Sequence, residues 1–155
     1  MAGKPLHRKR IYSARRPDIA WPYERGVIVI LGTGIDIIEI ERIKTALGRR
    51  TFAVRVFTER ERAYCDSRGA QRFASYAARF AAKEAVFKAF GTGLSAGSWQ
   101  DVEVLANEAG RPVVRLSGYF GELARKRGVT ELFLSLTHAR EYAAGQVILW
   151  GGPER

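Results

Sequence analysis

The stretch with the clearest potential for chemistry is RFAAKEAVFKAFGTG, residues 79–93, which sets one carboxylate among several cations in an alanine-rich segment. Alanines recur throughout 70–90 and favour a helix there, and Gly91 should end it. At about 100° per residue one apolar stripe should face the core, and it consists of Phe73, Tyr76, Ala77, Phe80 and Phe87. Glu84 falls near the middle of this stripe. The basic residues lie off its centre, with Lys83 and Lys88 at the margins and Arg79 beyond Lys83.

A carboxylate on an apolar stripe is costly unless another group compensates its charge. One interpretation of Glu84 is a buried ion pair, for example with Lys88 one turn later. The other is a metal ligand at the base of an anion pocket, because Mg²⁺ typically takes one or two protein carboxylates and completes its shell with water and phosphate. The helical pattern leaves both interpretations open, and a metal site would need a second carboxylate.

Asp36 is the candidate for that second carboxylate. It follows residues 27–35, a β-branched apolar segment that predicts a buried strand, loosened near its end by the Gly-Thr-Gly of 32–34. A helix is expected after it, ending near Gly48, with a buried stripe of Ile40, Ile43 and Leu47. Asp36 and Glu39 have capping-box spacing, so the local pattern favours a helix cap, although the residue also stands at a strand-to-helix junction where sites often lie.

Two further segments carry weaker signals. Residues 91–100, GTGLSAGSWQ, form a glycine- and serine-rich loop whose amides could cradle a phosphate, although the GxxxxGK[ST] pattern of a P-loop is absent. His138 directly follows residues 131–137, which alternate as a strand does. A histidine at a strand end is usually a solvated or hydrogen-bonded turn residue, and the alternative role is phosphate contact or proton transfer.

The remaining segments predict an α+β fold, with a small, mostly antiparallel sheet packed on the long central helix and shorter helices. The expected elements are a connecting piece at 52–57, a helix capped by Thr58 and Glu61, a hairpin of 101–106 with 112–116, a helix from Ser117 to about Arg127, and a strand at 142–150. We divide the chain into a basic extension, 1–26, one domain, 27–150, and a short tail, 151–155.

The composition of the 155 residues indicates one globular domain, since 46% of them are hydrophobic. Cys65 is the only cysteine, which excludes an intramolecular disulfide and a cysteine zinc cluster, and fits a cytoplasmic location. The longest apolar run, 27–31, is too short to span a bilayer, so no membrane association is expected.

The net charge of +10 predicts an acidic partner: nucleic acid, a phosphorylated ligand or an acidic protein. Half of this charge lies in residues 1–26, which hold seven Lys or Arg and two acidic residues and show no sustained helical or strand period. A basic nucleic-acid-binding module is therefore one hypothesis for the function. No DNA- or RNA-binding signature supports it, and the aromatic residues are mostly placed for a core.

Four segments in order carry a resemblance to a known family: GTGIDIIEIERI, RFAAKEAVFKAFGTG, WQDVEVLANEAGRP and SLTHAREYAAGQV. Together they resemble the holo-acyl-carrier-protein synthases, the bacterial 4′-phosphopantetheinyl transferases, over about residues 28–150. The resemblance implies that coenzyme A (CoA) donates its phosphopantetheine arm to a serine of acyl carrier protein in fatty acid biosynthesis, with release of 3′,5′-ADP. It also implies a requirement for Mg²⁺ and an active homotrimer whose sites lie between neighbouring subunits.

The resemblance also implies roles for individual residues. Asp36 and Glu84 match the metal ligands, and Glu84, Lys88 and His138 are the expected catalytic residues. The expected contacts to CoA are Arg79, Lys83, Lys88, Gly91, Thr92, Gly93 and His138. Relatives receive the acidic carrier protein on the helix after Asp36, so the expected docking residues are Arg42, Arg49 and, at the helix end, Arg50. Two departures from the family pattern are Val86-Phe87, where small or polar residues are common, and the extension 1–26.

Overall fold

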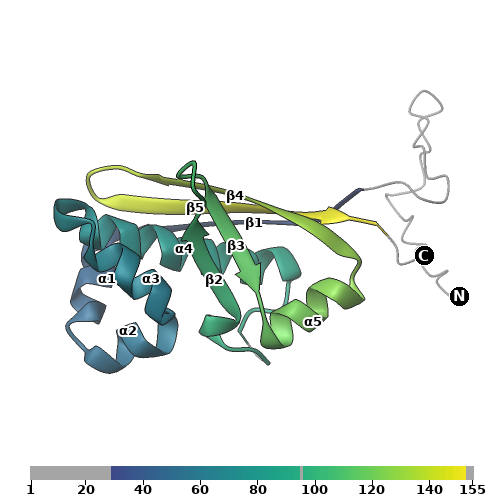
Figure 1. Ribbon diagram of the computed structural model, residues 1–155, viewed down its shortest axis with the longest axis horizontal. Coiled ribbons are helices and arrows are strands. Elements are labelled where there is room, and N and C mark those ends of the chain that lie inside the picture. The colour runs from purple at the N-terminus through teal and green to yellow at the C-terminus, as the bar shows by residue number, and fades with distance from the viewer. Residues whose placement is uncertain (1–28, 95, 153–155) are drawn as a thin grey trace, which may run out of the picture.

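The computed structural model describes residues 29–94 and 96–152, and the extension 1–26 and residues 153–155 lie outside this part. A three-stranded antiparallel sheet has the order β1-β5-β4 (Figure 1). Its strands are β1 Val29–Glu39, β5 Tyr142–Gly151 and β4 Val129–His138. A second, two-stranded antiparallel sheet pairs β2 Val102–Ala106 with β3 Pro112–Leu116. The predicted α+β fold and antiparallel sheet are confirmed, and β5 extends one residue into the expected tail.

The helices pack on one side of the three-stranded sheet. They are α1 Ile40–Leu47, α2 Arg50–Val56, α3 Glu59–Asp66, α4 Arg72–Phe90 and α5 Gly118–Lys126, with short 3-10 turns η1 Gly69–Gln71 and η2 Trp99–Asp101. Figure 1 shows α4 running beneath the sheet, with α1, α2 and α3 gathered at one end and α5 at the other. The predicted long central helix is confirmed, and Gly91 ends it in a left-handed conformation with φ 66°.

Glycines let the backbone of α4 approach the sheet. A Cβ atom on Gly34 of β1 would lie 1.9 Å from the carbonyl oxygen of Ala85, and one on Gly145 of β5 would lie 2.7 Å from the amide nitrogen of Ala82. The sequence suggested only that the glycines of 32–34 loosen the strand. In the structure, glycine facing alanine brings β1 and α4 close enough for short side chains on the two elements to meet.

Helix α4 is buried on more than one stripe. Its buried residues lie all around its axis, because the sheet covers one side while α3 and the β2–β3 hairpin cover others. Two core clusters meet on it, one around Phe87 and Phe120 and the other around Phe57 and Tyr76. The expectation that Glu84 lies mid-stripe in the core is therefore wrong: this side chain is half-buried, at an opening in the cover of the helix.

Three local expectations also need correction. Asp36 does not cap a helix, because β1 continues through it, with Asp36 opposite Gly145 and Glu39 opposite Tyr142. Helix α1 begins after Glu39, which makes no side-chain cap hydrogen bond. Residues 50–56 form helix α2, so the predicted connecting piece is helical and Arg50 begins α2. The capping box of Thr58 and Glu61 at the start of α3 is confirmed.

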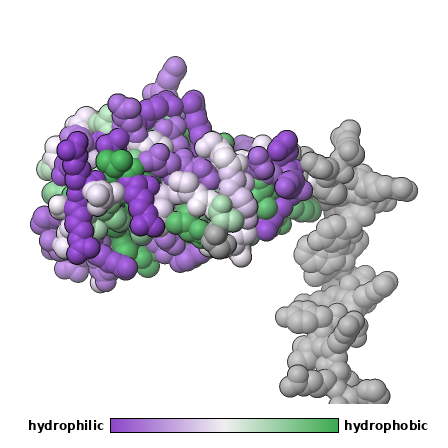
Figure 2. Space-filling model, turned by 90° about the horizontal axis from the view of Figure 1, so that it is seen from below, coloured by the Kyte–Doolittle hydropathy of each residue, from purple (hydrophilic) through white to green (hydrophobic). Residues whose placement is uncertain are grey.

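The opposite face of the three-stranded sheet is apolar and open among the described residues. Ile35 and Ile37 of β1 are 64% and 65% exposed, and Phe133 and Trp150 meet edge to face nearby on β4 and β5. No described helix lies on this face (Figure 1). By contrast, the helical side of the molecule, seen in Figure 2, is mainly hydrophilic with small hydrophobic patches. Among the described helices, none has the length and apolar character to cross a membrane.

Candidate active site

Two carboxylates meet where β1 crosses α4. From Gly32 to Ile38 the even-numbered residues of β1 face the helix, and Asp36 is one of them, with its side chain 15% exposed. Glu84 projects from α4, and burial raises the pKa of its carboxyl, with the negative charge of Asp36 raising it further. The structure thus brings together the two acidic residues, 48 positions apart in the sequence, that the sequence singled out.

Two cations accompany this carboxylate pair. Lys88 Nζ donates to Asp36 Oδ1 at 2.7 Å and to the carbonyl oxygen of Ile35 at 3.1 Å. The positive charges of Lys88 and Arg42 both act to lower the pKa of Glu84, against the larger effects of burial and Asp36. Lys88 therefore forms its ion pair with Asp36 on the neighbouring strand, whereas one interpretation of the helical spacing paired it with Glu84.

The chemistry of this pair fits Mg²⁺. Both donors are carboxylate oxygens, and they come from two elements that the glycine–alanine contacts hold close together. No group of three or more His, Cys, Asp or Glu side chains suited to a metal ion occurs among the described residues. A site with two carboxylates suits an ion that takes its remaining ligands from water and phosphate, as Mg²⁺ does.

Lys83, a predicted CoA contact, has other partners in the structure. Its side chain is fully buried, forms an ion pair with Glu61 at 2.8 Å, and donates to the carbonyl oxygens of Trp99 and Val102. Burial lowers the pKa of Lys83, and the negative charge of Glu61 opposes this effect. Three acceptors thus surround an ammonium group that has three protons, so the structure gives no support to the assignment of Lys83 to CoA. Its physical role is to join α4 to α3 and β2.

Arg79, the predicted phosphate contact, is also buried. Its Nε donates to the carbonyl oxygen of Val104 at 3.2 Å, and its Nη1 donates to that of Ser75 at 3.3 Å. Its guanidinium carbon lies 4.0 Å from the centre of the Tyr64 ring. These contacts place Arg79 under α3 and β2 and separate it from the surface, because α4 is covered on this side. Arg79 and Lys83 lie to the side of the predicted stripe, and this position was the only sequence signal that they contact a neighbouring element.

His138, the last residue of β4, lines a cavity of about 490 Å³ at the first turn of α4. The lining residues include Lys44 and Arg140, two basic side chains that the sequence analysis did not select. Lys44 also forms an exposed ion pair with Glu41 at 3.0 Å. Neither Asp36 nor Glu84 lines this cavity. In the sheet, Asp36 lies opposite Gly145 and His138 lies opposite Ala143, two residues away along β5.

The glycine loop lies at the other end of α4. Gly91 and Gly93 have positive φ angles of 66° and 58°, and Thr92 Oγ1 donates to the carbonyl oxygen of Gly93 at 3.2 Å. The 19 residues of α4 span about 28 Å at 1.5 Å per residue. The loop and His138 are thus separated by roughly the length of this helix, with the carboxylate pair between them.

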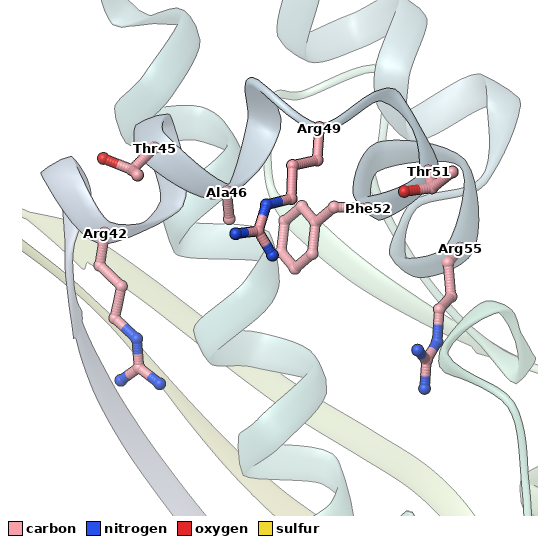
Figure 3. A pocket seen from close by; sticks show the side chains of 7 residues that line it. All are labelled: Arg42, Thr45, Ala46, Arg49, Thr51, Phe52 and Arg55. Carbon is pink, nitrogen blue, oxygen red and sulfur yellow. The ribbon is translucent and has the colours of Figure 1, made fainter.

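Helices α1 and α2 form a second cavity, which we call the arginine pocket, of about 440 Å³ (Figure 3). It is lined by Arg42, Thr45, Ala46, Arg49, Thr51, Phe52 and Arg55. Figure 3 shows Arg49 and Phe52 between the arginines at either side, Arg42 and Arg55. Two of the three predicted docking residues line the pocket, and the third, Arg50, is exposed outside it. Arg55 was missed because its segment was not expected to be helical; its spacing of three from Phe52 was the available signal.

Comparison with known proteins identifies relatives over most of the chain. A family model described as the 4′-phosphopantetheinyl transferase superfamily matches residues 32–147. A protein of Ruminiclostridium cellulolyticum named holo-(acyl-carrier-protein) synthase is 47% identical over 124 residues, which are 78% of this chain and 91% of the relative. One of the same name from Desulforudis audaxviator is 45% identical over 128 residues, 81% of this chain and 97% of the relative.

Solved structures agree with the sequence comparisons. The holo-(acyl-carrier-protein) synthase of Bacillus anthracis, in complex with CoA (3′,5′-ADP), is similar with a TM-score of 0.66 at 37% identity, covering 79% of this chain and 98% of that chain. The Helicobacter pylori synthase in complex with coenzyme A has a TM-score of 0.67 at 28% identity, covering 76% and 98%. The similarity therefore spans nearly the whole of each solved chain.

Proposed function

Since the chain belongs to the 4′-phosphopantetheinyl transferase superfamily, we propose that it transfers the 4′-phosphopantetheine arm of CoA to a serine of acyl carrier protein, releasing 3′,5′-ADP. The observation that carries the proposal is the carboxylate pair of Asp36 and Glu84 beside Lys88. The relatives at 45% to 47% identity are named for this activity, and the solved relative from Bacillus anthracis holds CoA (3′,5′-ADP). Neither the family nor these relatives favour the nucleic-acid-binding alternative.

The residues of this site suit phosphoryl transfer. Asp36 and Glu84 would hold Mg²⁺, which when bound neutralises charge on the pyrophosphate as the leaving group departs. Lys88 has a half-exposed side chain and can place its ammonium against a phosphate oxygen as a point charge. Positioning and electrostatic stabilisation provide most of the catalysis in this class of reaction, so no nucleophilic triad is required.

The arginine pocket suits an acidic carrier protein. Arg42, Arg49 and Arg55 set three positive charges around a low floor formed by Ala46 and Phe52. Such a surface steers an acidic partner during encounter and fixes its orientation. The positive charge of Arg42 also acts to lower the pKa of Glu84, so this docking surface is coupled electrostatically to the catalytic carboxylates.

Assembly into a homotrimer is part of the proposal, with His138 and the carboxylate pair of one site coming from different subunits. The cavity lined by His138 includes neither Asp36 nor Glu84, which supports this arrangement, and so does the apolar sheet face around Ile35 and Ile37. Burying that face between identical chains would remove it from water, and in a cyclic assembly every subunit buries the same face. The location we propose is the cytoplasm, which the single buried cysteine, Cys65, fits.

Mass spectrometry of apo acyl carrier protein tests the proposed function. After incubation with the purified chain, CoA and Mg²⁺, the carrier should gain the mass of one phosphopantetheine, and a carrier with alanine at the acceptor serine should not. An unmodified carrier after prolonged incubation with an excess of the chain would refute the transferase assignment. A gel shift with nucleic acid at physiological salt would then test the alternative.

A further inference from the structure

We propose that Lys88 competes with the divalent cation for Asp36, and that the pyrophosphate of CoA relieves this competition, so that metal and CoA bind cooperatively. The inference rests on the proposed function, and it assigns Lys88 a role before the transfer step. Lys88 then acts as a positioning residue that prevents the carboxylate pair from binding a divalent cation tightly until the donor substrate is present.

The contacts of Asp36 carry the argument. Lys88 Nζ lies 2.7 Å from Asp36 Oδ1 and 3.1 Å from the carbonyl oxygen of Ile35, so it is held by two acceptors on one strand. The Asp36 side chain is largely covered, at 15% exposure, which leaves few directions of approach to its oxygens. A cation that binds Oδ1 must therefore displace the ammonium group, and the loss of that ion pair weakens the binding.

Lys88 can move without disturbing the core. Its side chain is 52% exposed, and it is the one residue of the last two turns of α4 that points into solvent. A lysine ammonium is a point charge on a flexible four-carbon stem, so it can exchange a carboxylate for a nearby phosphate oxygen. The fully buried Lys83 on the same helix has no such freedom, because its partners are Glu61 and two carbonyl groups of the core.

Charge balance explains why the donor substrate matters. Asp36 and Glu84 carry two formal negative charges; the positive charge of Lys88 is paired with Asp36, and the positive charge of Arg42 acts on Glu84. A divalent cation alone therefore approaches a locally neutral site and gains little Coulomb energy. The pyrophosphate of CoA adds negative charge, offers oxygen ligands to the metal, and gives the Lys88 ammonium a new partner.

Binding linkage makes the inference quantitative. If CoA raises the affinity of the chain for the metal by some factor, the metal must raise the affinity for CoA by the same factor. We expect a factor of about ten or more for the wild-type chain, within the usual range of couplings between sites. Removal of the Lys88 charge should strengthen metal binding in the absence of CoA and diminish the factor.

The experiment titrates the full chain with Mn²⁺, an ion with similar preference for oxygen ligands, and follows free Mn²⁺ by electron paramagnetic resonance with and without CoA. Without CoA, Lys88→Met should bind Mn²⁺ about tenfold more tightly than wild type does. Addition of CoA should then raise the Mn²⁺ affinity of this variant by a smaller factor than it does for wild type. Lys88→Gln provides a second neutral variant, and Lys88→Arg, which keeps the charge, should resemble wild type. Arg60→Met is the matched control, because it removes one positive charge from an exposed ion pair with Glu103 and should leave Mn²⁺ binding unchanged.

Equal or weaker Mn²⁺ binding by both neutral Lys88 variants without CoA would overturn the inference. Equal Mn²⁺ affinity of the wild-type chain with and without CoA would also overturn it. The variant Asp36→Asn distinguishes a failure of this inference from a failure of the proposed function. If Asp36→Asn binds Mn²⁺ as tightly as the wild-type chain does in the presence of CoA, Asp36 is not a metal ligand and the assignment under the proposed function is wrong. Thermal unfolding of each variant verifies that it is folded.

Discussion

At the scale of single residues, the two carboxylates differ in their surroundings. Asp36 has an ammonium group within hydrogen-bonding distance, whereas the pKa of Glu84 is raised by burial and by the charge of Asp36. Both must be charged to hold a divalent cation. The protein therefore keeps a carboxylate in a position that disfavours its charge, which is typical of a functional residue.

Neutral isosteres should remove the metal without removing the fold. We expect Asp36→Asn and Glu84→Gln each to lose at least about two orders of magnitude in kcat, because charge neutralisation in the transition state is lost. The measurement is the rate of carrier modification at saturating Mg²⁺ and CoA, with circular dichroism to verify folding. Transfer by either variant at close to the wild-type rate would show that the residue is not a ligand.

Glu84→Gln should also be more stable than wild type at neutral pH. The raised pKa of Glu84 means that its ionised form destabilises the folded state at pH values above that pKa, and this cost disappears as the carboxyl is protonated on lowering the pH. Glutamine has no charge at any pH. The difference in urea midpoint between Glu84→Gln and the wild-type chain should therefore shrink as the pH falls toward about 4. Glu108→Gln, at an exposed position in the β2–β3 turn, is the control. A gain independent of pH would contradict the explanation.

At the scale of elements, the approach of α4 to β1 decides whether the site exists. Gly34→Ala should destabilise the chain by about 1–3 kcal/mol, because its Cβ would overlap the backbone of Ala85 and must push helix and strand apart. Gly121→Ala is a suitable control, since a Cβ there lies 3.4 Å from the nearest atom, within a helix that alanine favours. Urea denaturation measures both, and equal stability of the two variants would show that the close contact is unimportant.

Helices α1 and α2 carry the docking prediction. Arg42→Glu with Arg49→Glu should raise the KM for carrier protein strongly, leave the KM for CoA nearly unchanged, and flatten the salt dependence. Arg55→Glu alone should act in the same direction, since Arg55 lines the same pocket. The control is the equal charge reversal Arg111→Glu with Arg125→Glu, at exposed positions outside the pocket. If the control raises the carrier KM equally, the effect is one of net charge and the pocket is not the docking site.

At the scale of the whole molecule, an open apolar sheet face points to assembly. A stable monomer would leave Ile35 and Ile37 exposed to water on a face that no described helix covers. Contiguous apolar patches of this kind commonly mark protein interfaces. The trimer that we propose would bury this face and combine His138 of one subunit with the carboxylate pair of another.

Subunit mixing tests this arrangement directly. His138→Ala and Glu84→Gln chains, each inactive alone, should regain part of the wild-type activity when they are dissociated and reassociated together, because some sites then combine two intact residues. Light scattering of the wild-type chain should give the mass of a trimer. An active monomer, or a mixture that stays inactive although mixed trimers form, would exclude a site shared between subunits.

Local sequence patterns determined the main helix, its glycine end, the α3 capping box and the hairpin, because each depends on residues a few positions apart. The motifs likewise singled out Asp36 and Glu84 without any knowledge of the packing. Only the tertiary structure decided that β1 continues through Asp36, because pairing with β5 replaces the helix cap that the spacing favoured.

Tertiary structure also decided which charges meet. Lys88 and Asp36 are 52 positions apart, and Lys83 and Glu61 belong to different helices, so no local period could pair them. Lys83 lies at the margin of the predicted stripe and Arg79 beyond it, and the resemblance implied that both contact CoA, yet α3 and β2 cover them and make them core residues. The reason is physical: a sequence period reports one helix by itself, whereas burial and ion pairing depend on every element that packs around it.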